Sequence, residues 1–242
     1  MHAALRAFGP GVMVDVGAHH GQSFRRFAAD GWRVYAFEPD PVNRVVLVRR
    51  ARGLPNVTVD SRAVATRDGD LVTLYTSSIS TGISTLMPFH PTHRPSTQVA
   101  TVRLDTYLSQ VEQVTVLKTD AEGYDMPILR TFPWHRLKPR AVISEFEDAR
   151  SAGSGYTYRD MAEFLVDRGY SVFVSEWYPV VEYGRRHRWR SVREYPARLH
   201  DPRGWGNLIG VTPSGVEVLK RQLALETKWW ARLRGIATDM RR

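Results

Sequence analysis

The chain has 242 residues, which is enough for one sizeable α/β domain with a single core. Its formal net charge is +9, and 30 of its 34 cationic side chains are arginine, a balance that favours anionic partners such as acidic glycans, nucleic acid or a membrane surface. The absence of cysteine excludes disulfides, thiolate metal sites and a cysteine nucleophile, and without a membrane-spanning apolar run or a signal-peptide pattern we expect a cytoplasmic protein.

A strand, a glycine turn and a helix open the chain. Residues 12–16 are an apolar run that contains Asp15; the run ends in Gly17-Ala18-His19-His20-Gly21, and residues 22–30 follow with helical spacing. In a doubly wound sheet such a turn lies at the carboxyl end of a central strand, where ligands bind. The glycines are spaced G-x-x-x-G, unlike the G-x-G-x-x-G of nicotinamide sites, and the Gly-Lys-Ser/Thr of a P-loop is absent. An acid two residues before the first glycine suits a cationic, phosphate-free ligand such as S-adenosylmethionine.

A second acid ends the next expected strand. Residues 34–37 form this strand, and Glu38 follows the first glycine by about 20 residues, the offset of an acid that binds ribose hydroxyls. The two motifs together predict a nucleoside-binding pocket. Pro39-Asp40-Pro41 then forms a turn that opens a helix.

The middle of the chain changes character. Asp68-Gly69 lies between two apolar alternations, residues 63–66 and 71–75, and predicts a hairpin turn. Residues 77–98 are rich in Ser, Thr, Pro and His and show no periodicity, which is typical of a functional or disordered loop. As a lid or substrate loop, this segment would supply His90 or His93.

Acids follow two later buried strands. Residues 114–117 lead to Asp120, and residues 140–144 lead to Glu145. Because the strand ends of an open α/β sheet build the ligand site, we expect both acids to face the cleft as a general base, a divalent-cation site or both. An ion pair with nearby arginines is the alternative for Glu145. Asp125 precedes Met126-Pro127 and is expected to cap a helix.

Strands and helices alternate along the chain, which predicts a mostly parallel sheet with helices on both faces. With no internal repeat or long linker, residues 1–242 are expected to form one domain. Further strands are expected at residues 56–60, 99–103, 170–174 and 207–211.

Two cationic segments stand near the C-terminus. Residues 182–205 hold seven arginines interleaved with Tyr183, Trp189, Tyr195 and Trp205, a composition that suits a polyol or an anionic acceptor, although a solvated loop or an RNA surface would also fit. None of the usual RNA-binding signatures is present, so nucleic acid is not the expected partner. Residues 214–234 predict a long helix whose wide apolar face packs on the domain or on a homodimer partner, or lies on an anionic membrane surface.

Five segments in order, VDVGAHHGQS, YAFEPDPVN, VRLDTYL, VLKTDAEGYDMPILRTF and AVISEFE, resemble the FkbM-type methyltransferases. The resemblance runs from about Val12 to Glu147, and its most specific block is Leu117-Lys118-x-Asp120-x-Glu122-Gly123. It implies a Rossmann-like class I methyltransferase fold, with a mostly parallel seven-stranded sheet flanked by helices, besides the hairpin and the C-terminal helix. The sequence has His19 where such proteins often have Asn, and Asp125 where Glu is usual.

The resemblance also implies an activity and its residues. Such proteins are S-adenosylmethionine-dependent O-methyltransferases that act on hydroxyls of sugars, glycolipids or polyketides. Carried over by position, the cofactor-binding residues are Asp15, Gly17, Ala18, His19, Gly21 and Ser23 at the methionine side, Glu38 and Pro39 at the ribose, Ser61 and Arg62 beside the adenine, and Asp120 nearest the sulfonium.

Methyl transfer to an alcohol needs a group that removes or acidifies the hydroxyl proton. Asp120 is the first choice for the base, followed by Glu145 and Glu122, and a divalent cation such as Mg²⁺ could assist them. A histidine base, His20, His90 or His93, is the alternative. We expect a carbohydrate acceptor, possibly anionic; a polyketide or other small-molecule hydroxyl, or an RNA-binding protein with a nucleoside pocket, stays open.

Overall fold

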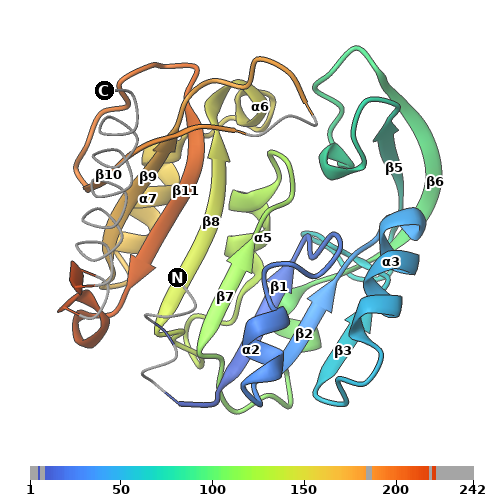
Figure 1. Ribbon diagram of the computed structural model, residues 1–242, viewed down its shortest axis with the longest axis horizontal. Helices are drawn as coiled ribbons and strands as arrows, with labels where there is room; N and C mark the ends of the chain where they lie inside the picture. The colour runs from blue at the N-terminus through green and yellow to red at the C-terminus, as the bar shows by residue number, and fades with distance from the viewer. Residues whose placement is uncertain (1–4, 6–8, 184–186, 218–219, 222–242) are drawn as a thin grey trace, which may run out of the picture.

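A central sheet with helices packed against it forms the body of the computed structural model, which describes residues 5, 9–183, 187–217 and 220–221 (Figure 1). The eight strands of this sheet lie in the order β10-β9-β11-β8-β7-β1-β2-β3. Their bounds are β1 Val12–Val16, β2 Arg33–Phe37, β3 Val57–Asp60, β7 Val116–Thr119, β8 Ala141–Glu147, β9 Ser171–Trp177, β10 Trp189–Glu194 and β11 Trp205–Val211.

The pairing of these strands is mostly parallel. β3, β2, β1, β7 and β8 pair in parallel, whereas β11 lies between β8 and β9 and is antiparallel to both. The fold is therefore the expected Rossmann-like α/β fold, with one more strand than the seven predicted. The additional strand, β10, pairs with the edge strand β9 and lies inside the cationic segment of residues 182–205, where no strand was predicted. Its residues are exposed or half-buried, so the segment lacks the apolar alternation that reveals a strand in sequence.

Two apolar clusters, one on each face of the sheet, hold the layers together. Neighbouring strand residues alternate between them: Met13 belongs to one cluster and Val14 to the other, as do Val116 and Leu117. The helices are α2 Arg25–Ala29, α3 Pro41–Ala51, α4 Leu104–Tyr107, α5 Asp125–Thr131, α6 Asp148–Ser151 and α7 Tyr158–Val166.

Two of these helices begin in different ways. Asp40 caps α3, because its carboxylate accepts hydrogen bonds from the N–H groups of Val42 at 2.8 Å and Asn43 at 3.4 Å. Asp125 was expected to cap α5 but is instead its first residue, and its carboxylate accepts the N–H of Ala121 at 3.3 Å. The prediction of its role was wrong because the carboxylate turns back to the preceding turn and not to the helix.

The expected hairpin is replaced by a second sheet of three strands in the order β4-β6-β5. β4 (Ala63–Val64) and β5 (Leu71–Ser77) do not pair with each other; both pair with β6 (His93–Val102). The turn between them is bonded to the end of β6 instead, since Gly69 N–H donates to Thr101 O at 3.0 Å. Residues 93–98, expected as loop, belong to β6, so the connection is residues 78–92, with the short 3-10 helix η2 (Thr81–Ile83) in it.

Part of the sequence prediction falls on residues outside this description. Residues 213–217 are helical, as expected, but most of the predicted helix over residues 214–234 lies outside the described residues, and so do residues 184–186. Within the described part of the chain, no helix combines the length and apolar character that crossing a bilayer requires.

Candidate active site

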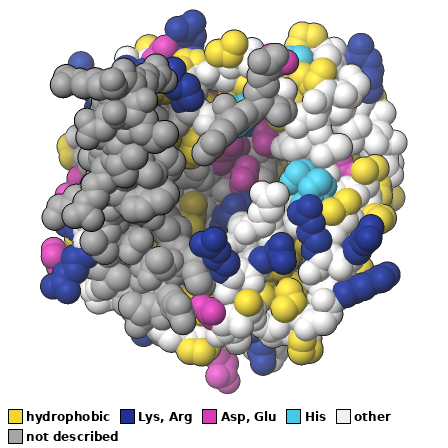
Figure 2. All heavy atoms as spheres, in the orientation of Figure 1, with side chains coloured by type: hydrophobic (Ala, Val, Ile, Leu, Met, Phe, Trp, Pro, Cys, Tyr) yellow, Lys and Arg dark blue, Asp and Glu magenta, His cyan; other side chains and the backbone are white. Residues whose placement is uncertain are grey.

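A cavity of about 300 Å³ opens at the carboxyl ends of β1, β2, β7 and β8, within the size range of small-molecule sites. One side is formed by the residues that follow β1 and β2, and the opposite side by residues 120–124 and the end of β8. The β5–β6 connection and residues from 180 to 205 complete the lining. Figure 2 shows acidic side chains gathered in the hollow, beside the histidine side chains at its edge.

The glycine turn fits closely between two strands. Gly17 has a φ of +73°, and a Cβ at this position would overlap the carbonyl oxygen of Asp120, so only glycine fits. The N–H groups of Gly17 and Ala18 both donate to Phe37 O, at 3.1 and 3.0 Å. His19 also adopts a left-handed conformation, with a φ of 47°, which is uncommon for a residue with a side chain. The turn is therefore a specific conformation held against β2 and β7.

Glu38 is the acid held by this turn. Its carboxylate accepts the N–H of His19 at 2.6 Å and the N–H of Asp40 at 2.9 Å. Burial raises the pKa of Glu38 to about 7, against the opposing effect of these two hydrogen bonds. A buried, oriented carboxylate that lines the cavity is what a ribose diol requires, and Pro39 lines the cavity beside it.

Lys118 joins two acids beneath the cavity. Its ammonium nitrogen lies 3.1 Å from Asp15 Oδ1 and 3.3 Å from Asp120 Oδ2. Asp15 is completely buried, and burial raises its pKa although Lys118 and the hydroxyl of Ser23, which donates to Asp15, oppose that effect. The three charged groups thus form a continuous link from the buried strand β1 to the cavity.

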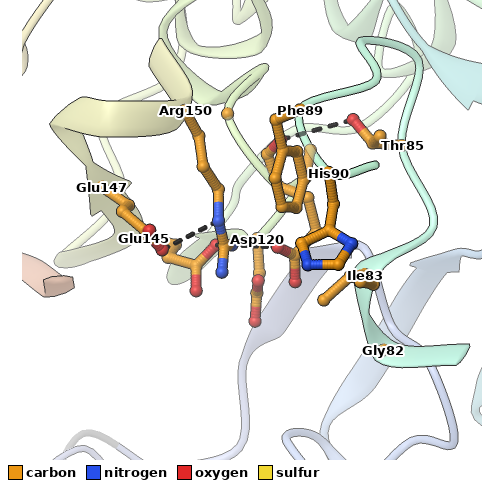
Figure 3. Close-up of polar contacts among 12 residues, drawn as sticks. Gly82, Ile83, Thr85, Phe89, His90, Asp120, Glu145, Glu147 and Arg150 are labelled. Carbon is orange, nitrogen blue, oxygen red and sulfur yellow. Dashed lines mark hydrogen bonds and ion pairs between the residues drawn. The ribbon is translucent and has the colours of Figure 1, made fainter. Parts of the chain in front are cut away.

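Asp120, Glu122 and Glu145 meet at the other end of the cavity, where one ligand oxygen from each lies within 4.8 Å of the others. Arg150, from α6, enters this group: its Nη1 contacts Glu122 and lies 3.4 Å from Glu145, and its Nε lies 2.8 Å from a carboxylate oxygen of Glu147 (Figure 3). The guanidinium therefore supplies the positive charge that these acids need.

The acids remain difficult to ionise despite Arg150. Burial raises the pKa of Glu122 to about 8, and burial together with the Glu122 charge raises the pKa of Glu145 well above its usual range. The carboxylates of Glu122 and Glu145 therefore hold a proton near neutral pH.

Glu122 also has a positive φ of 54°, an uncommon conformation for a residue other than glycine.

The β5–β6 connection closes over the side of the cavity that His19 and Glu38 line. Thr81 is the first residue of η2, with its hydroxyl 3.2 Å from His19 Nε2 and its carbonyl accepting a hydrogen bond from Asn43 Nδ2 at 2.9 Å. Ser84 donates to Asp40 Oδ2 at 2.6 Å. These contacts fasten the connection to the segment that carries Glu38.

The two histidines expected from this connection take different positions. His93 is buried at the start of β6, where Nδ1 accepts the N–H groups of Phe89 and His90, and Nε2 lies 2.9 Å from Ile83 O. Its ring holds the connection in place and is not among the residues that line the cavity. His90 packs edge-on against Tyr183, with ring centroids 5.5 Å apart. Phe89 covers the guanidinium of Arg150 (Figure 3).

A family model described as the methyltransferase FkbM domain matches residues 15–172. The chain belongs to the FkbM methyltransferase family. It is therefore a methyltransferase of the S-adenosylmethionine-dependent type, and its sheet order agrees with that assignment. A search of curated proteins found no match.

Solved structures similar to this FkbM methyltransferase are distant in sequence. A precorrin-6y C5,15-methyltransferase from Geobacter metallireducens is 14% identical, with a TM-score of 0.46 over 86% of this chain and 84% of that one. An rRNA methylase from Streptococcus thermophilus is 12% identical, with a TM-score of 0.44 over 87% and 93%. A TehB-like SAM-dependent methyltransferase from Corynebacterium glutamicum is 11% identical, with a TM-score of 0.41 over 86% and 85%.

The residues predicted for this FkbM methyltransferase fall into three groups. The cavity is lined by Gly17, His19, Glu38, Pro39, Asp120, Glu122 and Glu145. The lining is supported from behind by Asp15, Ala18, Gly21 and Ser23. Ser61 and Arg62 do not line the cavity; the lining there is Ala63 and Val64, and Arg62 pairs with Asp60 at 2.7 Å.

Sequence reasoning missed two charged residues of this FkbM methyltransferase. Lys118 stands within the conspicuous block that ends in Asp120, so its position next to an acid was visible in the sequence. For Arg150 the signal was partial: the ion pair of Glu145 with a nearby arginine, given as the alternative, is present at 3.4 Å, but the contact with Glu122, 28 residues away, depends on how α6 packs. Asn43 and His187 also line the cavity without having been singled out, whereas Tyr183 and Trp205 line it and belong to the predicted aromatic and cationic segment.

Proposed function

We propose that the protein transfers a methyl group from S-adenosylmethionine to a hydroxyl of a carbohydrate, a sugar, oligosaccharide or glycolipid. The observation that carries this proposal is that one cavity is lined both by Glu38, the ribose-type acid, and by the carboxylates of Asp120, Glu122 and Glu145. The proposed donor site and the acids that could accept a hydroxyl proton thus line the same cavity.

The residues around Glu38 fit the donor. When bound, S-adenosylmethionine supplies an electrophilic methyl on a positively charged sulfur. Glu38 would accept hydrogen bonds from the ribose hydroxyls, and Gly17 and His19 would border the methionine end. The carboxylate of Asp120 would place negative charge near the sulfonium, which favours binding of the cation.

The opposite end of the cavity fits a hydroxyl acceptor. Asp120 is proposed as the base, because its side chain is 36% exposed, whereas the side chains of Glu122 and Glu145 are 11% and 8% exposed. Lys118 holds the Asp120 carboxylate in place at 3.3 Å. Orientation of the hydroxyl toward the methyl contributes several kcal/mol to such a reaction, at order-of-magnitude accuracy.

Arg150 bears on the role of metal ions. Its guanidinium contacts Glu122 and lies 3.4 Å from Glu145, two members of the Asp120, Glu122 and Glu145 group, which is the only group of described acids and histidines with metal-ligand spacing. The proposed mechanism therefore uses the protein's own carboxylates, and a divalent cation is not part of it.

The acceptor itself is proposed from the remaining lining. Tyr183 and Trp205 border the cavity, and such rings can cover the face of a sugar. Arg150 is the only guanidinium among the described lining residues and is already paired with carboxylates. This favours a neutral, hydroxyl-bearing ring at the reacting end over an anionic group.

A screen of labelled methyl transfer tests the proposal. The full chain would be offered sugars, oligosaccharides, glycolipids, polyketide hydroxyls and RNA, each with and without a chelator. We expect transfer to a carbohydrate that persists in chelator and is lost in the Asp120→Asn variant. Transfer only to a polyketide would show that the acceptor is a polyketide hydroxyl, and transfer to RNA alone would overturn the assignment of a carbohydrate acceptor. Loss of transfer in the presence of chelator would show that the reaction needs a divalent cation.

A further inference from the structure

The outer face of α2 and α3 carries an unusual set of exposed side chains. The α3 face presents Val42, Val45 and Val48, which are 63%, 71% and 47% exposed. The exposed arginines on α2, on α3 and directly after α3 are Arg25, Arg26, Arg49, Arg50 and Arg52. Figure 2 shows Lys and Arg side chains over the region that α2 and α3 occupy in Figure 1.

Two of the valines and one arginine lie on one side of α3. Residues 42, 45 and 49 follow the three- and four-residue spacing that places side chains on one face of a helix, and Arg52 comes directly after the helix. The opposite face is buried, with Asn43 and Leu47 packed inward. α2 lies on the same side of the sheet, because Phe27 from α2 and Leu47 from α3 belong to the same apolar cluster.

This face holds almost no compensating negative charge. Between Gly17 and Val57 the acidic residues are Asp30, Glu38 and Asp40, and the last two are buried. The exposed charge of α2 and α3 is therefore cationic. It lies next to exposed apolar side chains, whose removal from water would be favourable.

α3 also contacts the glycine turn that lines the cavity. Arg50 Nη1 donates to His20 O at 3.2 Å, and the adjacent His19 lines the cavity. A bilayer bound to α2 and α3 would thus lie near the His19 end of the cavity.

We propose that this face of α2 and α3 docks the protein on an anionic lipid bilayer. Arginines attract the negative headgroups, and the exposed valines enter the boundary between headgroups and acyl chains. The strength of such binding increases with both the apolar area buried and the attraction to anionic lipids. RNA fits less well, since single-stranded RNA is held by stacking on aromatic rings, and the aromatic side chains of this region, Phe24, Phe27 and Trp32, are buried.

Vesicle sedimentation of the full chain tests this inference. The vesicles are phosphatidylcholine alone, or phosphatidylcholine with roughly 30% phosphatidylserine. The charge variant is Arg25→Gln/Arg49→Gln/Arg52→Gln, and the apolar variant is Val42→Ser/Val45→Ser/Val48→Ser. A matched control removes three exposed arginines elsewhere, Arg67, Arg130 and Arg198, by the same change to Gln. Unchanged affinity for S-adenosylmethionine in calorimetry establishes that each variant is folded.

We expect wild type to sediment only with the anionic vesicles. At about a fivefold loss per arginine, the charge variant should lose roughly a hundredfold in partitioning, while the control loses much less. The apolar variant should lose several-fold. No sedimentation of wild type, equal losses in the charge variant and the control, or full binding by the apolar variant would each overturn the proposal. Retention on RNA that depends on the arginines but not on the valines would replace the bilayer with RNA.

Discussion

The ammonium nitrogen of Lys118 lies 3.1 Å from Asp15 Oδ1, and the two residues face each other in the paired strands β1 and β7. Asp15 is completely buried, and the Lys118 side chain is 13% exposed. The same ammonium reaches Asp120 at 3.3 Å. A single cation therefore balances one acid inside the sheet and another that faces the cavity.

Removing this cation should destabilise the protein. In Lys118→Met the buried Asp15 loses its partner, and breaking a buried pair from one side costs about 3–5 kcal/mol. Urea unfolding of wild type and variant measures the difference. The double variant Asp15→Asn/Lys118→Met is the matched control, because it removes both charges, and it should recover most of the loss. Equal stability of Lys118→Met and wild type would show that the pair does not stabilise the sheet.

Glu38 should control binding of the methyl donor. Glu38→Gln removes a charged acceptor, which costs about 1.5–3 kcal/mol, or roughly 10- to 100-fold in the dissociation constant. Because the pKa of Glu38 is raised to about 7, wild-type affinity should also increase between pH 6 and pH 8 as the carboxylate ionises. Calorimetry across this range measures both effects. Asp120→Asn serves as the contrast, since it should keep donor binding and lose most turnover. If the donor affinity of Glu38→Gln still depended steeply on pH, Glu38 could not be the source of the pH dependence.

Arg150 should be needed most at alkaline pH. In Arg150→Met the carboxylates of Glu122, Glu145 and Glu147 lose their common partner, at a cost of about 3–5 kcal/mol when they are charged. The pKa of Glu122 is already about 8 with Arg150 present, so these acids can take up protons at lower pH and escape part of the cost. Denaturation at pH 6 and pH 9 should show the larger loss at pH 9. Addition of Glu122→Gln should restore part of it, and a loss independent of pH would contradict the charge explanation.

Asp125 should lower the stability of the protein as pH rises. Burial raises its pKa from 3.8 to about 7, so the folded protein binds this proton more tightly than the unfolded chain does. The tighter proton binding by Asp125 stabilises the folded protein fully below about pH 4. This contribution is lost as pH rises through about 7, and its upper limit is about 4 kcal/mol. Asp125→Asn keeps an acceptor for the Ala121 N–H and does not titrate. It should therefore be more stable than wild type at pH 8, with a smaller difference at pH 4; the opposite order at pH 8 would be incompatible with a raised pKa.

Short-range spacing explains which parts of the site were predictable. Glu38 follows the glycine turn at an offset set by one helix and one strand, and the structure places it in the cavity as expected. Asp120 and Glu145 follow from the rule that the ends of parallel strands share one edge of a sheet, although Glu145 lies within β8 and not after it. In these cases the local pattern determines the position of the residue.

Contacts between distant segments explain what was not predictable. The Asp68-Gly69 turn has the composition of a hairpin, but its hydrogen bonds go to β6, whose pairing with both β4 and β5 no local pattern specifies. Arg150 is one of 30 arginines, and only the packing of α6 brings it to Glu122. The strand β10 is similarly hidden, because its half-buried residues carry no apolar alternation.

The β5–β6 connection touches both ends of the cavity. Thr81 contacts His19, and four residues later the Thr85 hydroxyl donates to Glu122 O at 3.3 Å. Under the proposed function, these two contacts lie at the donor end and at the acceptor end of the cavity. A change in the length of this connection would then alter donor binding and acceptor choice together.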